Sequence, residues 1–192
     1  MAGMAAPVSV IEAQPTKVMT SIEVVGQTEG AKEVEVRARV GGILLQRTYE
    51  EGASVKAGQK LFQIDRAPLE IALAQARATQ VEAQARVDQT TRETARLKGM
   101  LAQNAISQKE YDDMVSSSAI AKATLLAAQA RVRDAELNLS YAQVTAPIGG
   151  ITGRAQKSEG TLVSAGGDSL LTTIAQTDPI WVRFSIADNE LD

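Results

Sequence analysis

Residues 68–142 read PLEIALAQARATQVEAQARVDQTTRETARLKGMLAQNAISQKEYDDMVSSSAIAKATLLAAQARVRDAELNLSYA. Two runs in this stretch place mostly apolar or small residues at alternating steps of four and three, the core pattern of a coiled coil. The first run is Leu69, Leu73, Ala76, Gln80, Ala83, Val87, Thr90, Thr94, Leu97 and Leu101. The second run is Tyr111, Met114, Ser118, Ala121, Leu125, Ala128, Val132, Ala135, Leu139 and Ala142. Only residues 103–107 separate the runs, so we expect two antiparallel helices, each about 50 Å long.

Alanine dominates this predicted seam, and Gln80, Thr90, Thr94 and Ser118 also occupy core positions. At about 25 cal/mol per Å² of buried apolar area, such layers stabilise a hairpin less than leucine layers do. Close alanine packing between two helices explains the composition. The alternative is a softer seam that lets the arms flex or pack against further copies, and the sequence leaves both open.

The composition of the chain excludes several classes of function. The 192 residues have a net charge of −3 with both signs interspersed, and they include no histidine or cysteine. Mixed charge argues against a nucleic-acid partner. The missing residue types exclude imidazole and thiolate metal sites, disulfides and most acid–base schemes. We therefore expect no enzyme activity, no cofactor and no metal. The sequence also contains no apolar run that would span a membrane or act as a signal peptide.

Alternating residues and glycine-containing turns predict short strands on both sides of the hairpin. The strands expected before it cover residues 8–11, 17–25, 34–40, 42–48, 54–55 and 60–64. After it, residues 178–187 alternate again. Because a lone strand is unstable, this segment pairs with the N-terminal strands near residues 18–25 or belongs to a larger β domain. We expect both, as the first strands of a barrel whose remainder is missing from this chain.

An internal repeat with an offset of 108 residues links the two sides. Its matching pairs are Gly41-Gly42-Ile43 with Gly149-Gly150-Ile151, Glu51-Gly52 with Glu159-Gly160, Val55 with Val163, and Ala57-Gly58 with Ala165-Gly166. Each half-sheet is too small to bury its own apolar face, so the halves should fold together into a quasi-symmetric β-sandwich or flattened barrel. The hairpin is then an insertion between Asp65 and Val144. We interpret the glycine pairs as turns or close backbone approaches, with a ligand-binding role as the alternative.

In this order of parts the chain resembles the periplasmic adaptors, or membrane fusion proteins, of tripartite efflux pumps. Val144-Thr145-Ala146-Pro147-Ile148-Gly149-Gly150-Ile151 is similar to the family motif at which the chain returns from the hairpin. Asp178-Pro179-Ile180-Trp181-Val182 resembles the start of the barrel in the branch that serves resistance–nodulation–division (RND) transporters. The resemblance covers about residues 8–192.

The resemblance implies an α+β fold: a lipoyl-like β-sandwich split by a long antiparallel coiled-coil hairpin, plus partial β-barrel strands. The expected domains are residues 1–33 (N-terminal strands of an incomplete barrel), 34–65 and 144–175 (the two lipoyl-like halves), 66–143 (the hairpin) and 176–192 (the start of the barrel). A lipoyl domain carries its modified lysine on the turn that joins its halves. Because the hairpin replaces that turn here, we exclude a carrier function.

The function implied by the resemblance is that of an adaptor between an inner-membrane RND-type drug exporter and an outer-membrane channel. The adaptor would form a trimer or hexamer in the assembled pump. It would lie in the periplasm, attached to the inner membrane in the full-length protein by an anchor that is absent from this chain. Two alternatives are an adaptor of an ATP-driven exporter or type I secretion system, disfavoured by residues 178–184, and a purely structural coiled-coil protein, disfavoured by the repeat.

The family carries a motif at the hairpin tip: an arginine, a leucine four residues later and a serine seven residues further. Arg96 and Ser107 match it, and Met100 with Leu101 beside it stands at the leucine position. The resemblance therefore implies a partner-binding site at Arg96, Met100, Leu101 and Ser107, with methionine preserving the apolar contact. Two roles stay open for Ser107, because a serine three residues before Glu110 also predicts a capping box, with Ile106 and Tyr111 as a hydrophobic staple. For Arg96 the alternative is a solvated surface charge.

Overall fold

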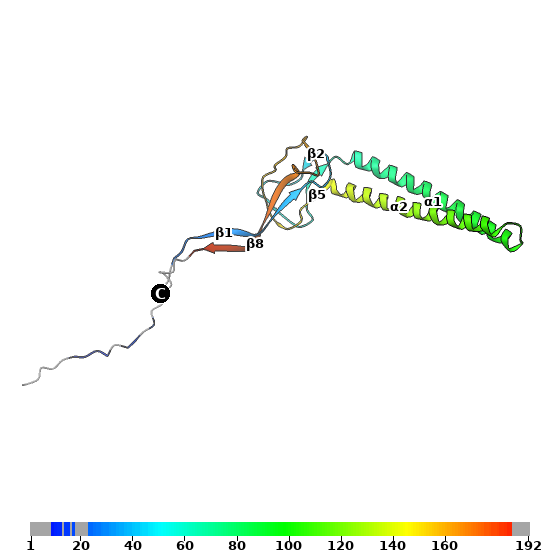
Figure 1. Cartoon of the computed structure of the whole chain (residues 1–192). Coiled ribbons are helices and arrows are strands. Elements are labelled where there is room, and N and C mark those ends of the chain that lie inside the picture. Colours follow the sequence, from blue (N-terminus) through cyan, green and yellow to red (C-terminus); the bar gives the residue numbers. More distant parts are fainter. Residues whose placement is uncertain (1–8, 13, 16, 18–22, 186–192) are drawn as a thin grey trace, which may run out of the picture. The chain divides into compact units, whose positions relative to one another are not determined.

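The computed structural model describes residues 9–12, 14–15, 17 and 23–185. Its elements are β1 (Gly26–Arg37), β2 (Gly42–Arg47), β3 (Ser54–Val55), β4 (Lys60–Ile64), α1 (Ala67–Ala102), α2 (Gln108–Tyr141), β5 (Gln143–Thr145), β6 (Gly150–Thr152), β7 (Leu162–Val163) and β8 (Leu170–Phe184) (Figure 1). The strands form two four-stranded sheets, ordered β1-β8-β6-β3 and β5-β4-β2-β7. The chain divides into two compact units, residues 30–180 and the terminal segments 1–29 with 181–192. The predicted α+β class is confirmed.

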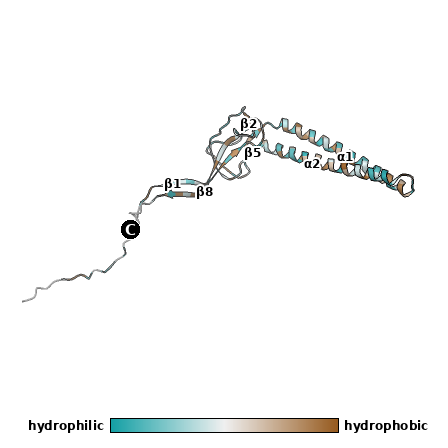
Figure 2. Cartoon of the chain, viewed as in Figure 1, coloured by the Kyte–Doolittle hydropathy of each residue, from teal (hydrophilic) through white to brown (hydrophobic). Residues whose placement is uncertain are grey.

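The two helices form the antiparallel hairpin that the periodicity predicts, and both carry hydrophilic and hydrophobic residues along their length (Figure 2). Every predicted seam position is buried or half-buried, including the polar Thr90 and Ser118. Pro68 stands in the first turn of α1, where its missing N–H costs nothing. An ion pair of 2.9 Å between Arg77 Nη2 and Glu136 Oε1 links the arms. Among the described residues, neither helix is long and apolar enough to cross a bilayer.

The 108-residue repeat appears in the structure as an exchange of strands between the halves. Strand β2 pairs with β7, placing Gly42 opposite Val163, and β3 pairs with β6, placing Val55 opposite Gly150. The two pairs are equivalent under the repeat, because Gly150 lies 108 residues after Gly42 and Val55 lies 108 residues before Val163. Each half thus lends a two-residue strand to the sheet of the other half, and the predicted quasi-symmetric sandwich is confirmed.

The core of the sandwich draws on both halves. Its buried residues are Val36, Ala38, Val40, Leu44, Tyr49, Val55, Leu61, Phe62, Ile64, Ala142, Val144, Ala146, Val163, Leu171 and Ile174. The symmetry is imperfect at several core positions; for example, the equivalents of Leu44 and Ile64 are Thr152 and Thr172. Each threonine is buried and donates its hydroxyl hydrogen bond to a backbone carbonyl oxygen, that of Glu50 at 3.1 Å for Thr152 and that of Gly153 at 3.1 Å for Thr172. Both polar groups are therefore satisfied inside the core.

The N-terminal strand predictions need correction. Residues 9–12, 17 and 23–25 belong to no strand, and β1 begins only at Gly26. Residues 8 and 18–22 lie outside the described part. Alternating apolar and polar residues did not suffice at the described positions, because a strand also requires a neighbouring strand with which to form hydrogen bonds. Gly30 lies inside β1, where a Cβ atom would approach the carbonyl oxygen of Gln176 to 2.7 Å.

The paired ends of β1 and β8 belong to the terminal unit. Arg183 Nη2 and Glu29 Oε1 form an ion pair of 2.7 Å there. The expected pairing of N- and C-terminal segments is present between β8 and β1, which starts at Gly26, and the described residues 23–25 of the predicted segment belong to no strand. Strand β8 also begins at Leu170, eight residues before the predicted start. The expected end of that strand at Ala187 lies beyond the described residues.

Candidate partner-docking site at the hairpin tip

A tight turn ends α1. The N–H of Asn104 donates to the carbonyl oxygen of Leu101 at 2.9 Å, and the N–H of Ala105 donates to that of Met100 at 2.9 Å. Asn104 has φ = +55°, and asparagine adopts this left-handed conformation more readily than most residues. This is the Schellman arrangement, which satisfies carbonyl groups left free at a helix end.

A capping box begins α2, as the sequence predicts. The Ser107 hydroxyl oxygen accepts a hydrogen bond from the Glu110 N–H at 3.3 Å. In return, Glu110 Oε2 accepts bonds from the Ser107 N–H and from its hydroxyl, both at 3.1 Å. The five-residue loop is therefore hydrogen-bonded to a helix at each end.

The four predicted docking residues are presented in different ways. Arg96 is exposed and forms an ion pair with Glu93, one turn earlier on α1. Met100 and Leu101 are half-buried, and Leu101 is also the last seam position of α1. Ser107 is exposed on the loop. The tip thus offers a charged group at Arg96, part of an apolar surface at Met100, and a hydroxyl group engaged in the cap.

The sequence interpretation missed two residues at the tip. Asn104 was read only as part of the reversal, although an asparagine shortly after the last periodic position is a known signal for a left-handed helix end. Glu93 was not considered, although it precedes Arg96 by three residues, a spacing that brings side chains together on a helix. Ile106 and Tyr111 are half-buried, as the predicted staple requires.

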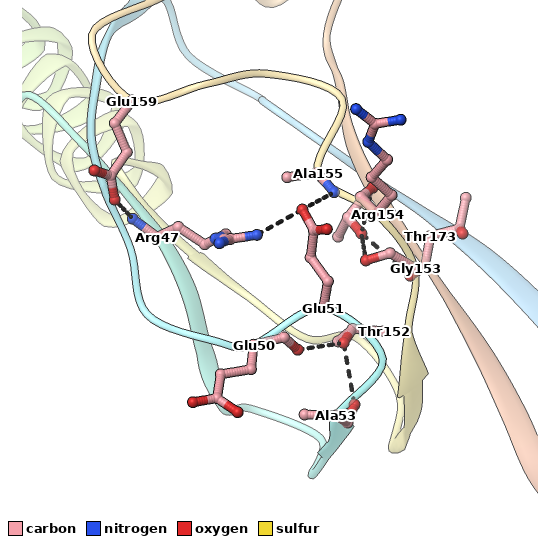
Figure 3. Close-up of polar contacts among 11 residues, drawn as sticks. Arg47, Glu50, Glu51, Ala53, Thr152, Gly153, Arg154, Ala155, Glu159 and Thr173 are labelled. Atoms are coloured by element: carbon pink, nitrogen blue, oxygen red, sulfur yellow. Dashed lines mark hydrogen bonds and ion pairs between the residues drawn. The ribbon is translucent and has the colours of Figure 1, made fainter.

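A second polar cluster joins the two halves of the sandwich (Figure 3). Glu159 Oε1 accepts a hydrogen bond from the Arg47 N–H at 2.7 Å, and Glu51 Oε1 accepts one from the Ala155 N–H at 3.0 Å. Arg47 Nη1 also reaches Glu51 Oε1 at 2.6 Å. These contacts explain the repeated Glu-Gly pair as a structural link. Within the described parts of the chain, no three acidic, histidine or cysteine side chains gather as a metal site.

Solved structures of membrane fusion proteins share this architecture. A chimera of MacA and MexA, containing the α-hairpin domain of Pseudomonas aeruginosa MexA, is 28% identical with a TM-score of 0.57, over 88% of this chain and 54% of the chimera. The membrane fusion protein Spr0693 from Streptococcus pneumoniae has a TM-score of 0.65 at 17% identity, over 86% of this chain and 71% of that one. The second likeness concerns the fold alone.

The sequence model described as "RND MFP, barrel-sandwich hybrid domain" matches residues 32–175. The chain therefore belongs to the family of RND membrane fusion proteins. It is 42% identical to the efflux pump periplasmic linker BepD of Brucella suis, over 95% of this chain and 46% of BepD. It is 40% identical to the membrane fusion protein MtrC of Neisseria gonorrhoeae, over 99% of this chain and 47% of MtrC. The chain thus spans about half the length of these relatives.

Proposed function

We propose that this chain is the hairpin-bearing part of a periplasmic adaptor that links an inner-membrane RND-type drug exporter to an outer-membrane channel. The observation that carries the proposal is a hairpin whose tip is tied at both helix ends and exposes Arg96. Relatives described as an efflux pump periplasmic linker and a membrane fusion protein support it. In this proposal residues 34–65 and 144–175 form the lipoyl-like domain, 66–143 the arm, and 1–33 with 176–192 the start of a barrel.

The adaptor works by geometry and not by catalysis. The arm spans distance, and the tip that carries Arg96, Met100, Leu101 and Ser107 docks on the channel. Several copies, three or six in the assembled pump, supply avidity without strong individual contacts. The protein lies in the periplasm and is held at the inner membrane. An adaptor for an ATP-driven exporter is not favoured, because the family model that matches residues 32–175 describes RND membrane fusion proteins.

Two charge changes at the tip test this function. We expect Arg96→Asp and Ser107→Arg each to lower drug efflux in cells while circular dichroism shows an intact fold. Arg131→Asp is the matched control, because Arg131 is exposed on α2 at a distance of many turns from the loop. Normal efflux in both tip variants would remove the tip from the docking site.

A further inference from the structure

The hydroxyl group of Ser107 is already engaged within the hairpin. Its proton is donated to Glu110 Oε2, and one lone pair accepts the Glu110 N–H. A hydroxyl group has a single proton to donate. A partner that accepts a hydrogen bond from Ser107 must therefore take this proton from Glu110 Oε2, while the Ser107 oxygen and N–H stay engaged in the capping box.

We infer that Ser107 is a positioning residue for docking and that Glu110, which the tip motif does not include, is equally required. The inference rests on the proposed function, because it assigns roles within the same tip. Glu110 holds both the N–H and the hydroxyl of Ser107. Removing its carboxylate should therefore disturb the loop as much as removing the hydroxyl does, although Glu110 lies on the first turn of α2.

The short loop makes this support necessary. Its other end is fixed by the turn at Asn104, so the capping box determines how the residues between the two anchors are presented. Gln103 and Asn104 are exposed there. In this arrangement the partner contacts Arg96, Met100 and the exposed amide side chains, while Ser107 and Glu110 hold the loop in place for that contact.

The chain offers substitutions that separate a cap from a contact. Ser107→Asn removes the hydroxyl but keeps an N-cap residue as favourable as serine, whereas Ser107→Ala removes both. Glu110→Gln keeps the side-chain acceptor of the capping box, and Glu110→Ala removes it. Asp113→Ala is the control for lost charge, because Asp113 is an exposed carboxylate on the next turn of the same helix.

Two measurements apply to each variant of the adaptor: amide hydrogen exchange at residues 105–111, and affinity for the purified outer-membrane channel. We expect Ser107→Ala and Glu110→Ala to raise exchange and weaken binding by about fivefold, the effect of losing one cap. Ser107→Asn, Glu110→Gln and Asp113→Ala should behave like the parent protein. Wild-type binding by Glu110→Ala, or equal weakening by Ser107→Asn and Ser107→Ala, would overturn the inference alone. A parent protein with no affinity for the channel would overturn the proposed function as well, while the exchange data would still report on the cap.

Discussion

Glu51 and Glu159 stand 108 residues apart, and each accepts a backbone N–H from the half of the sandwich to which it does not belong. Their donors, Ala155 and Arg47, are also 108 residues apart. The two contacts are therefore the same interaction made twice, in opposite directions. They lie next to the two-residue strands that the halves exchange, where few ladder hydrogen bonds hold the sheets together.

We expect Glu159→Ala to lower the free energy of unfolding by about 1 kcal/mol, the typical net contribution of one hydrogen bond, because this bond is exposed. Glu51→Ala should cost slightly more, because Glu51 also pairs with Arg47, although such an exposed pair adds at most about 1 kcal/mol. Glu50→Ala is the control, since Figure 3 shows its carboxylate directed away from this cluster. Urea unfolding measures all three. Equal stability of Glu159→Ala and Glu50→Ala would contradict the assigned link.

Tyr49 provides a test at high pH. Burial raises the pKa of its hydroxyl above 10.0, against the smaller opposing effects of Thr172 and Arg47. The hydroxyl oxygen has no hydrogen-bond partner of good geometry among the residues described. The ring packs edge-on against Phe62 at 5.3 Å between centroids, a contact that phenylalanine would keep. Tyr49→Phe should therefore leave stability at pH 7 unchanged or slightly higher.

The sign of the pH effect follows from the direction of the shift. Because the folded state holds the Tyr49 proton more tightly than the unfolded state, its contribution is fully present below pH 10 and is lost as pH rises through the raised pKa. The parent protein should thus lose more stability than Tyr49→Phe between about pH 9 and pH 11. Denaturant unfolding at both pH values measures this difference. An equal loss of stability in the parent protein and in Tyr49→Phe would show that Tyr49 ionises as freely in the folded state as in the unfolded state.

A larger side chain between the helices tests how closely the alanine-rich seam packs. Ala128 is 4% exposed between the helices, whereas its neighbour Ala127 is exposed. If the arms pack closely, Ala128→Leu should wedge them apart and cost about 1–3 kcal/mol, while Ala127→Leu should have little effect. Thermal unfolding followed by helical circular dichroism compares the two variants. A stabilised Ala128→Leu protein would instead favour the soft seam.

Two glycines should respond to alanine in opposite directions. At Gly150, a Cβ atom would meet the carbonyl oxygen of Ala175 at 2.3 Å, so Gly150→Ala should separate β6 from β8 and destabilise the sandwich by more than about 2 kcal/mol. Gly99 lies inside α1 with open space around it, so Gly99→Ala should stabilise the hairpin by about 0.5–1 kcal/mol. Unfolding curves for both variants check the signs, and a neutral Gly150→Ala would contradict the close approach.

The hairpin was predictable because its pattern is local. A periodicity of 3.5 residues repeated over many turns fixes which side chains face the partner helix, and a five-residue gap forces the reversal. Ser107 and Glu110 were recognisable for the same reason, since a capping box involves residues only three apart. The repeat likewise predicts that two half-sheets combine, because each half alone is too small to bury its apolar face.

Contacts between distant parts were not predictable in the same way. Alternation near Val24 looked like a strand, but strand formation depends on a neighbour that the local sequence does not specify. The repeated Glu51 and Glu159 were visible as a pattern, yet their acceptor role depends on the exchange of β3 and β7 between sheets. At the tip, by contrast, Asn104 was predictable, because an asparagine shortly after the last periodic position is a local signal for a left-handed helix end.

The way in which the two helices join the sandwich has a mechanical consequence. Helix α1 follows β4 and α2 leads into β5, and these two strands are neighbours in one sheet although they come from different halves of the repeat. A pull or twist applied at the far end would reach the sheet as shear between these strands. The load would thus fall on the contact between the two halves of the repeat. The carboxylates of Glu51 and Glu159, which each bind the opposite half, would resist separation of the halves.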